Sequence, residues 1–146
     1  MNVFVMDSNS KIAARLLWEL DKVRARKQAV EMCQMLACLT NLNVPKKDGS
    51  FYKKPKSIYN HPATIWLRSD LKHITWCIDY LEELVFVTHT QGCLNALKVF
   101  KQIRPDLIPV NVKFSWITKK TPQPFNCLFE STKWYIQQKQ LGLFKN

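Results

Sequence analysis

Four charged side chains between positions 13 and 27 have a spacing that could serve chemistry on a nucleic acid. Read as an α-helix, this segment places them on one line: Arg15, Glu19, Lys22 and Arg26. Steps of four, three and four residues return to nearly the same side of a helix. Three cations then flank one carboxylate, which suits a phosphodiester backbone with an acidic group near the sugar or base. The alternative is an ordinary surface pair between Arg15 and Glu19.

Two roles are predicted for residues of this kind. Glu19 or Asp21 would act as a general acid or base, and His61 would position a phosphate. The predicted DNA contacts are Arg15, Lys22, Arg24, Arg26, Lys27, Lys53, Lys54, Lys56, Asn60, His61 and Arg68.

A basic run with two aromatic residues lies between Asn41 and Tyr59. Its lysines are Lys46, Lys47, Lys53, Lys54 and Lys56. A loop that follows a nucleic-acid strand uses rings such as Phe51 and Tyr52 to stack on bases, while lysines hold the phosphates. A solvated surface loop is the alternative interpretation.

Asn60, His61 and Pro62 predict the entrance to a helix, because proline is tolerated in the first helical turn. The backbone N–H groups there point outward and attract anions, so Asn60 or His61 could contact a phosphate. A simple capping role for this pair is the alternative.

Several kinds of site are not predicted. The three glycines are scattered, so no phosphate-binding glycine loop is present in the sequence. The three histidines lie too far apart for a local metal signature, and we expect neither a metal nor a cofactor. The five cysteines contain no Cys-x-x-Cys pair and suit reduced, mostly buried thiols of an intracellular protein.

Composition and charge indicate one globular domain, residues 1–146, with a polyanionic partner. The chain has 22 Lys and Arg against 11 Asp and Glu, a net charge of +11. Double-stranded DNA is therefore the first expected partner, ahead of a membrane surface. No signal peptide or membrane-spanning window is recognised, so we expect a cytoplasmic protein. The oligomeric state is left open.

The hydrophobic pattern predicts a mainly α-helical fold. A first helix should begin near Ser10, with a kink or break between Asp21 and Gln28. The densest apolar repeat, from Leu67 to Val85, predicts a central buried helix that also carries Trp66 and Trp76. Further helices are expected over residues 94–101 and 126–141, the second ended by Gly142. Residues 105–124 hold four prolines and predict a long ordered loop.

The segment Asn60-His61-Pro62-Ala63-Thr64-Ile65-Trp66-Leu67-Arg68 resembles a run shared by a family of small phage-encoded proteins. The resemblance extends over about the first two-thirds of the chain and includes the apolar start before Asp7, the Ala13-Ala14 pair and the Asp21-Lys22 pair. It implies a phage protein in the cytoplasm of an infected host cell. That family usually carries His after Asp-Lys, where this sequence has Val23.

More remotely, the layout resembles the phage pyrimidine-dimer DNA glycosylase called endonuclease V. The shared features are an early Leu-rich helix with Lys22 and Arg26, a central helix, and Trp134-Tyr135 near the C-terminus. The resemblance implies a compact helical bundle with long basic and Pro-rich loops. It also implies nucleotide flipping, attack by the N-terminal amine and a Glu on the first helix. The position matching that Glu is Val23, and Asn2 is a poor residue for removal of Met1.

Two functions are predicted from these observations. The first is a phage-type protein that binds duplex DNA and acts on a flipped base, as a glycosylase with lyase activity or as a base-modifying enzyme. The second is a DNA- or protein-binding factor without catalysis, favoured by Val23 at the expected carboxylate position.

Overall fold

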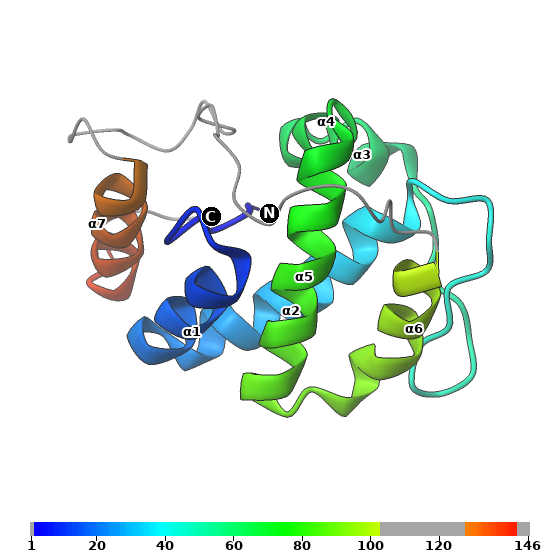
Figure 1. Cartoon of the computed structure of the whole chain (residues 1–146), viewed down its shortest axis with the longest axis horizontal. Helices are drawn as coiled ribbons and strands as arrows, with labels where there is room; N and C mark the ends of the chain where they lie inside the picture. The colour runs from blue at the N-terminus through cyan, green and yellow to red at the C-terminus, as the bar shows by residue number, and fades with distance from the viewer. Residues whose placement is uncertain (1, 103–127, 143–146) are drawn as a thin grey trace.

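The computed structural model describes residues 2–102 and 128–142, which are mainly helical, as predicted (Figure 1). The helices are α1 (Ser10–Leu20), α2 (Lys22–Ala37), α3 (Lys56–Tyr59), α4 (Pro62–Arg68), α5 (Leu71–Thr88), the 3₁₀ turn η1 (Gln91–Cys93), α6 (Leu94–Gln102) and α7 (Leu128–Gln140). Within these described ranges, no helix is both long and apolar enough to cross a membrane. The predicted Pro-rich loop at 105–124 lies outside the described residues.

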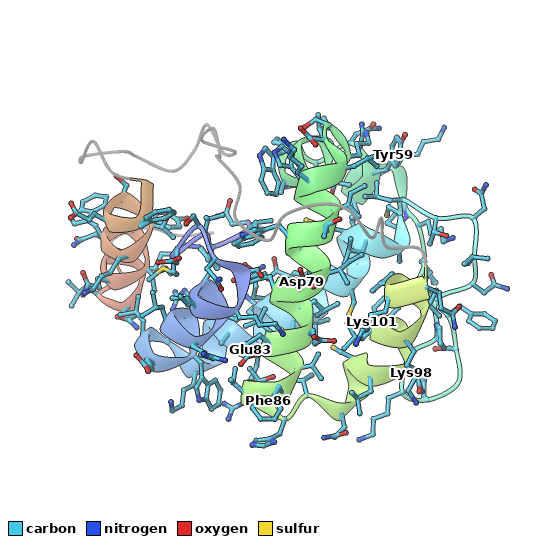
Figure 2. The ribbon with its side chains drawn as sticks, in the orientation of Figure 1. Tyr59, Asp79, Glu83, Phe86, Lys98 and Lys101 are labelled. Carbon is cyan, nitrogen blue, oxygen red and sulfur yellow. The ribbon has the colours of Figure 1, made fainter. Side chains whose placement is uncertain are left out.

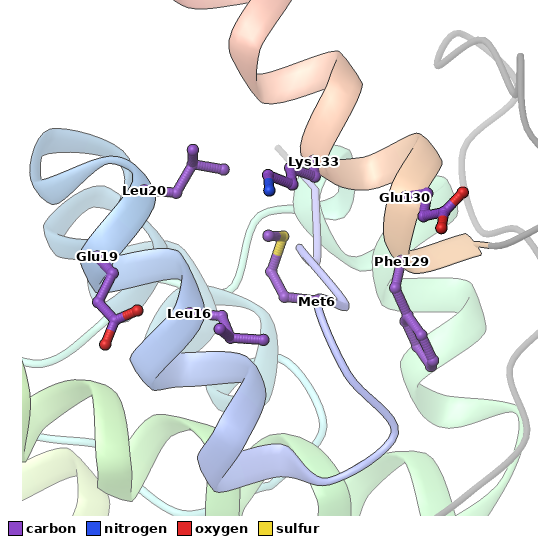
Figure 3. Close-up of a pocket in the computed structure, with 7 residues that line it drawn as sticks. All are labelled: Met6, Leu16, Glu19, Leu20, Phe129, Glu130 and Lys133. Carbon is purple, nitrogen blue, oxygen red and sulfur yellow. The ribbon is translucent and has the colours of Figure 1, made fainter.

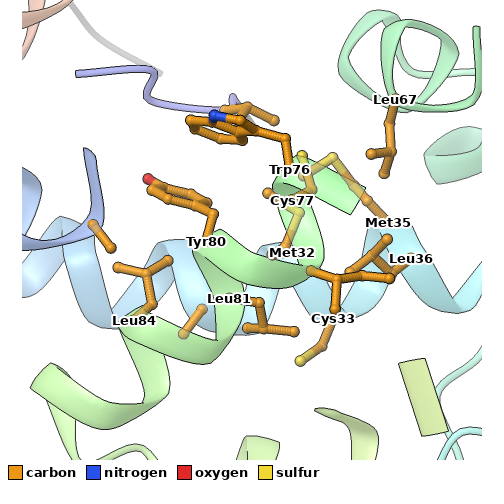
Figure 4. Packing of buried hydrophobic residues seen from close by; sticks show 14 of the residues in the cluster. Met32, Cys33, Met35, Leu36, Leu67, Trp76, Cys77, Tyr80, Leu81 and Leu84 are labelled. Atoms are coloured by element: carbon orange, nitrogen blue, oxygen red, sulfur yellow. The ribbon is translucent and has the colours of Figure 1, made fainter. Parts of the chain in front are cut away.

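The central helix is α5, which contacts α1, α2, α4 and α6. Its buried residues Trp76, Tyr80, Leu81 and Leu84 pack over the buried side of α2 (Figure 4). The predicted central helix is therefore confirmed, but its predicted start is wrong. The chain breaks before Leu71, because the Asp70 side chain accepts the Lys72 backbone N–H and begins a new helix. Trp66 and Trp76 are both buried, as expected.

The predicted break after the first helix is found at Asp21, where the backbone is extended (φ −156°, ψ 99°). Asn9 caps the start of α1, and Asp21 separates α1 from α2. The expected single line of four charges on one helix is therefore wrong. Arg15 and Glu19 lie on α1, whereas Lys22 and Arg26 lie on α2.

The chain before α1 is extended and is held to the helices by side chains. Gln28 of α2 accepts the Phe4 N–H through Oε1 at 2.8 Å and donates from Nε2 to the Asn2 carbonyl at 2.7 Å. The Tyr80 hydroxyl lies 3.2 Å from both the Phe4 carbonyl oxygen and Gln28 Oε1. These bonds satisfy half-buried backbone groups that would otherwise lack partners in the protein.

Ion pairs join α1, α5 and α6. Glu82 accepts from Lys11 at 3.1 Å and pairs with Lys101. Arg15 Nε donates at 2.9 Å to the buried Glu83, which is labelled on α5 in Figure 2. Arg15 is therefore paired with Glu83 rather than with Glu19, so the predicted Arg15–Glu19 surface pair is wrong.

The later helices agree with the sequence pattern. The expected helix at 94–101 is α6, and the expected helix at 126–141 is α7, which spans Leu128–Gln140. Gly142 follows it with a φ of 75°, the left-handed conformation that suits a helix terminator.

Cys33, Cys77 and Cys93 are buried free thiols, and Cys38 is half-buried. Cys127 lies outside the described residues.

Replacing Gln28 tests how the N-terminal segment is held. Gln28→Ala leaves the half-buried Phe4 N–H and Asn2 carbonyl without their partners, and each such group costs about 1–3 kcal/mol. We expect the free energy of unfolding, measured by urea denaturation, to fall by about 3 kcal/mol. Gln34→Ala, on the half-exposed side of the same helix, is the matched control and should stay within about 0.5 kcal/mol of the wild type. Equal losses in the two variants would contradict this role.

Candidate nucleic-acid interface

The outward side of α2 carries cations and small apolar residues together. Lys22, Val23, Arg26, Lys27 and Val30 are exposed there. The opposite side of the helix is buried and consists of Ala25, Gln28, Ala29, Met32, Cys33, Met35 and Leu36. The helical period therefore places the exposed cations of α2 on its solvent side and its core residues on the side that packs against α5.

Two open hollows run along this outward side. The first is lined by Val23, Arg26, Lys27, Val30, Glu31 and Gln34. The second is lined by Val30, Gln34, Lys46, Lys47, Asp48, Tyr52, Thr90, Gly92 and Cys93. Because Val30 and Gln34 belong to both hollows, the two lie side by side, and together they are called the α2 groove below. Its walls carry four cations and two carboxylates.

Trp18 fixes two cations beside the groove. Lys22 Nζ lies 4.2 Å from the centre of the indole ring and donates to the Trp18 carbonyl at 3.3 Å. The guanidinium carbon of Arg26 lies 5.0 Å from the same ring centre. Both distances are within the range of cation–π attraction, so the indole holds the two charges close together while leaving them exposed.

A short hairpin over residues 44–52 places the lysines of the second hollow. The Lys46 N–H donates to the Ser50 carbonyl at 2.7 Å, and the Tyr52 N–H donates to the Val44 carbonyl at 2.8 Å. Gly49, with a φ of 85°, makes the turn that the hairpin needs. Lys46 Nζ lies 5.4 Å from the centre of the Tyr52 ring. The expected basic loop is thus ordered here, and Phe51 remains 52% exposed beside it.

Asp21, predicted as a general acid or base, has a structural role. Its carboxylate accepts the Arg24 N–H at 3.0 Å, the Arg24 guanidinium at 2.5 Å and Gln140 Nε2 at 3.1 Å. Burial alone would raise the pKa of this carboxyl, but the bonds from Arg24 and Gln140 outweigh it and lower the pKa below the ordinary value. The carboxylate is therefore ionised, and its oxygens already accept bonds from Arg24 and Gln140. It lies at the joint between α1, α2 and α7.

Besides Arg15, which pairs with Glu83, and Lys22, which donates to the Trp18 carbonyl, three more of the predicted DNA-contacting cations are bonded to the protein itself. Arg24 pairs with Asp21, as described above. Lys54 donates to the Leu42 carbonyl at 2.7 Å and also to the Thr40 carbonyl, beyond the end of α2. Arg68 donates to the Tyr59 carbonyl, and its guanidinium carbon lies 4.0 Å from the centre of the Tyr59 ring. Through these contacts the three side chains hold loops and helix ends in place.

The Asn60 and His61 pair lies away from the start of α2. His61 caps α4 through Nδ1, which accepts the Ala63 N–H at 3.1 Å, so the capping interpretation is observed. Asn60 is the exposed residue at the end of α3. The 16 residues of α2 span about 24 Å, and Lys54 anchors the chain before α3 beyond the far end of that helix. Neither hollow of the α2 groove includes Asn60, His61 or Arg68.

Lys53 and Lys56, the latter at the start of α3, are exposed, and neither lines the α2 groove.

Glu19 lies in a separate pocket between α1 and α7 (Figure 3). Its apolar residues are Met6, Leu16, Leu20 and Phe129, and its polar residues are Glu19, Glu130 and Lys133. Met6 lies between the two helices, with Lys133 reaching over it from α7 (Figure 3). This α1–α7 pocket is not part of the α2 groove, because the two share no lining residue.

Some residues of these surfaces were not singled out from the sequence. Val30 and Gln34 connect the two hollows, and Lys133 faces the pocket of Glu19. The α2 residues have a signal in the sequence, because 23, 26, 27, 30 and 34 follow helical three- and four-residue steps on one side. No local pattern in the sequence indicates that Lys133 lies near Glu19, because 114 positions separate the two residues.

Comparison with models of protein families, with curated proteins and with solved structures finds no match. The resemblances to small phage proteins and to endonuclease V therefore stay predictions. The function proposed next depends on the geometry of this chain.

Asp21→Asn tests whether this carboxylate is a structural joint. The variant keeps an oxygen for the helix cap but loses the charge that Arg24 requires, so the free energy of unfolding should fall by about 1–2 kcal/mol at neutral pH. Because the pKa of Asp21 is lower in the folded state, the wild-type advantage is complete above about pH 4. It should disappear as the pH falls through the lowered folded pKa.

Urea denaturation at several pH values measures this effect. Asp70→Asn is the matched control, because Asp70 also caps a helix but is exposed and accepts only the Lys72 N–H among the side-chain bonds of the described residues. A deficit in Asp21→Asn that persists unchanged at low pH would contradict the proposed pairing.

Proposed function

We propose that this protein binds duplex DNA along the α2 groove. The observation that carries the proposal is the arrangement of five exposed cations along one side of α2 and the 44–52 hairpin: Lys22, Arg26, Lys27, Lys46 and Lys47. None of the five forms an ion pair with another residue in the described ranges.

The distribution of ion pairs supports this choice of surface. Lys11, Arg15, Arg24 and Lys101 are neutralised by Glu82, Glu83 or Asp21, so their charge is used within the fold. The groove cations form no such ion pair in the described part of the chain, although Glu31 and Asp48 line the same hollows, so most of their charge is available to a partner. A phosphate backbone gains from such cations by releasing its condensed counterions.

The shape of the surface favours a duplex over a membrane. An α-helix fits the major groove of B-form DNA, and about 24 Å of α2 presents its outward side. Val23 and Val30 alternate there with Arg26 and Lys27, so apolar contacts to bases and charged contacts to phosphates would come from one helix. A membrane-surface helix instead separates a wide apolar face from its cations.

The α1–α7 pocket favours a second candidate, which is action on a base flipped out of that duplex. The pocket has a volume of about 350 Å³, within the range of small-molecule sites. Its apolar residues could cover a base, while Glu19 and Lys133 at its edge supply an acid–base group and an amine. Glu19 follows Trp18, on which Lys22 and Arg26 rest, so a bound phosphate backbone would pass close to the pocket.

Binding to a labelled duplex, measured by fluorescence anisotropy over a series of salt concentrations, tests the first proposal. The affinity should fall steeply with salt. The plot of log K against log salt has a negative slope, and each lost phosphate contact makes this slope less steep by about 0.9. Arg26→Ala/Lys27→Ala should therefore make it less steep by about 1.8.

Lys72→Ala/Lys98→Ala is the matched control for that experiment. It removes the same net charge from exposed lysines of α5 and α6 that line neither hollow. The control should change the slope much less. An equal effect of the two double variants, or binding that does not depend on salt, would overturn the proposed surface.

Incubation with damaged, abasic and modified duplexes tests the second candidate. We expect base release or strand cleavage on one of these substrates, and a drop of about 10²-fold or more in Glu19→Gln, because a general acid or base contributes that much. DNA affinity should be unchanged in this variant. No altered base, no cleavage and no borohydride-trapped adduct on any substrate would exclude the enzyme and leave a DNA-binding factor.

A further inference from the structure

The middle of the outward side of α2 is uncharged, although cations lie on both sides of it. The buried side of the helix is centred on Met32. Because successive residues of an α-helix are turned by about 100°, the side opposite Met32 is centred on Val23. By the same rotation Val30 and Gln34 lie within about 20° of Val23. These three residues form a straight row along the helix, called the central line below.

Cations flank the central line. Lys22 and Arg26 lie on one side of it and Lys27 on the other, and all three are exposed. The Trp18 ring holds the first two on their side, with its centre 4.2 Å from Lys22 Nζ and 5.0 Å from the Arg26 guanidinium carbon. Glu31, the carboxylate of this hollow, lies beyond Lys27 and farther from the central line. A helix in the major groove has a phosphate backbone on each side, so this order places cations at the phosphates and the central line at the base edges.

The two valines of the central line are not explained by the fold. Val23 is 67% exposed and Val30 is 40% exposed. Valine also favours a helix less than alanine, lysine or glutamate does, because its branched side chain loses rotational freedom there. Neither burial nor helix propensity therefore accounts for valine at these positions. Contact with an apolar group of a bound partner would bury both side chains.

Thymine supplies such an apolar group in the major groove. Its C5 methyl group points into this groove, where the other base edges present hydrogen-bond donors and acceptors. Gln34, the polar residue of the central line, carries the amide that pairs with adenine. All three side chains thus match features of A·T pairs. From Val23 to Gln34 the helix rises about 16 Å, which is the length of about five base pairs.

We propose that Val23 and Val30 read thymine methyl groups in the major groove, so that the protein prefers duplexes with A·T pairs in the bound segment. This inference rests on the proposed DNA surface, because it needs α2 to lie in the major groove. It adds a sequence preference to a surface whose cations alone would bind any duplex.

Replacing thymine by deoxyuridine tests the proposal, because deoxyuridine pairs with adenine and keeps the O4 acceptor but lacks the methyl group. Selection from a pool of duplexes with a randomised core, using the full-length chain, first identifies the preferred site. Fluorescence anisotropy then compares this duplex with versions that carry deoxyuridine at one or more thymine positions. We expect the affinity to fall about four-fold for each of two methyl groups, and about 15-fold when both are absent.

Two variants assign the effect to the valines. Val23→Ala/Val30→Ala should bind the thymine and deoxyuridine duplexes with nearly equal affinity and with the salt dependence of the wild type. Both positions are exposed and alanine favours the helix, so this variant should fold. Ile65→Ala is the matched control, because Ile65 is 45% exposed on α4 and lines neither hollow. It should keep the full preference for thymine.

Three results would overturn this inference while the proposed DNA surface stands, provided that binding to duplex DNA still falls with salt. They are selection of no preferred site or of a site without thymine, equal affinity of the wild type for the two duplexes, and an unchanged preference in the valine variant. Absence of binding to every duplex in the pool would overturn the inference and the DNA surface together.

Discussion

The fold depends on the Asp21 carboxylate, which ends one helix and begins the next. Its backbone N–H donates to the Leu17 carbonyl at the end of α1, and its side chain accepts the Arg24 N–H at the start of α2. Gln140 of α7 donates to the same carboxylate and to the Leu20 carbonyl. One buried charge thus joins three helices, and its removal would leave several donors without a partner.

The direction that α2 takes after this joint divides the charges of the molecule into two groups. Cations of α1 and α6 reach the acidic residues of α5 and hold the helices together. The exposed cations of α2 face away from α5 and lie along the groove with those of the hairpin, whereas Arg24 pairs with Asp21. Within the described residues the cations of the groove form no ion pair, which is the physical basis of the proposed DNA surface.

Local sequence signals predicted much of the helix arrangement. They failed where the conformation or the role of a side chain depends on a partner far away in the sequence. The Asn9 cap, the break near Asp21 and the terminating Gly142 follow from residues next to them. The break before Leu71 was missed because the apolar spacing of Leu67, Leu71 and Ile74 continues across it. The roles of Lys54 and Arg68 were missed because their carbonyl partners lie 14 and 9 positions away, and the Gln140 contact to Asp21 lies 119 positions away.

The central claim, that duplex DNA covers the α2 groove, is tested most directly by lysine acetylation with and without DNA. Mass spectrometry would compare the modification of each lysine in the free and bound protein. The account predicts that DNA protects Lys22, Lys27, Lys46 and Lys47 and leaves Lys72 and Lys98 reactive. Protection confined to Lys53, Lys56 and Lys72, or protection of no lysine while DNA is bound, would contradict it.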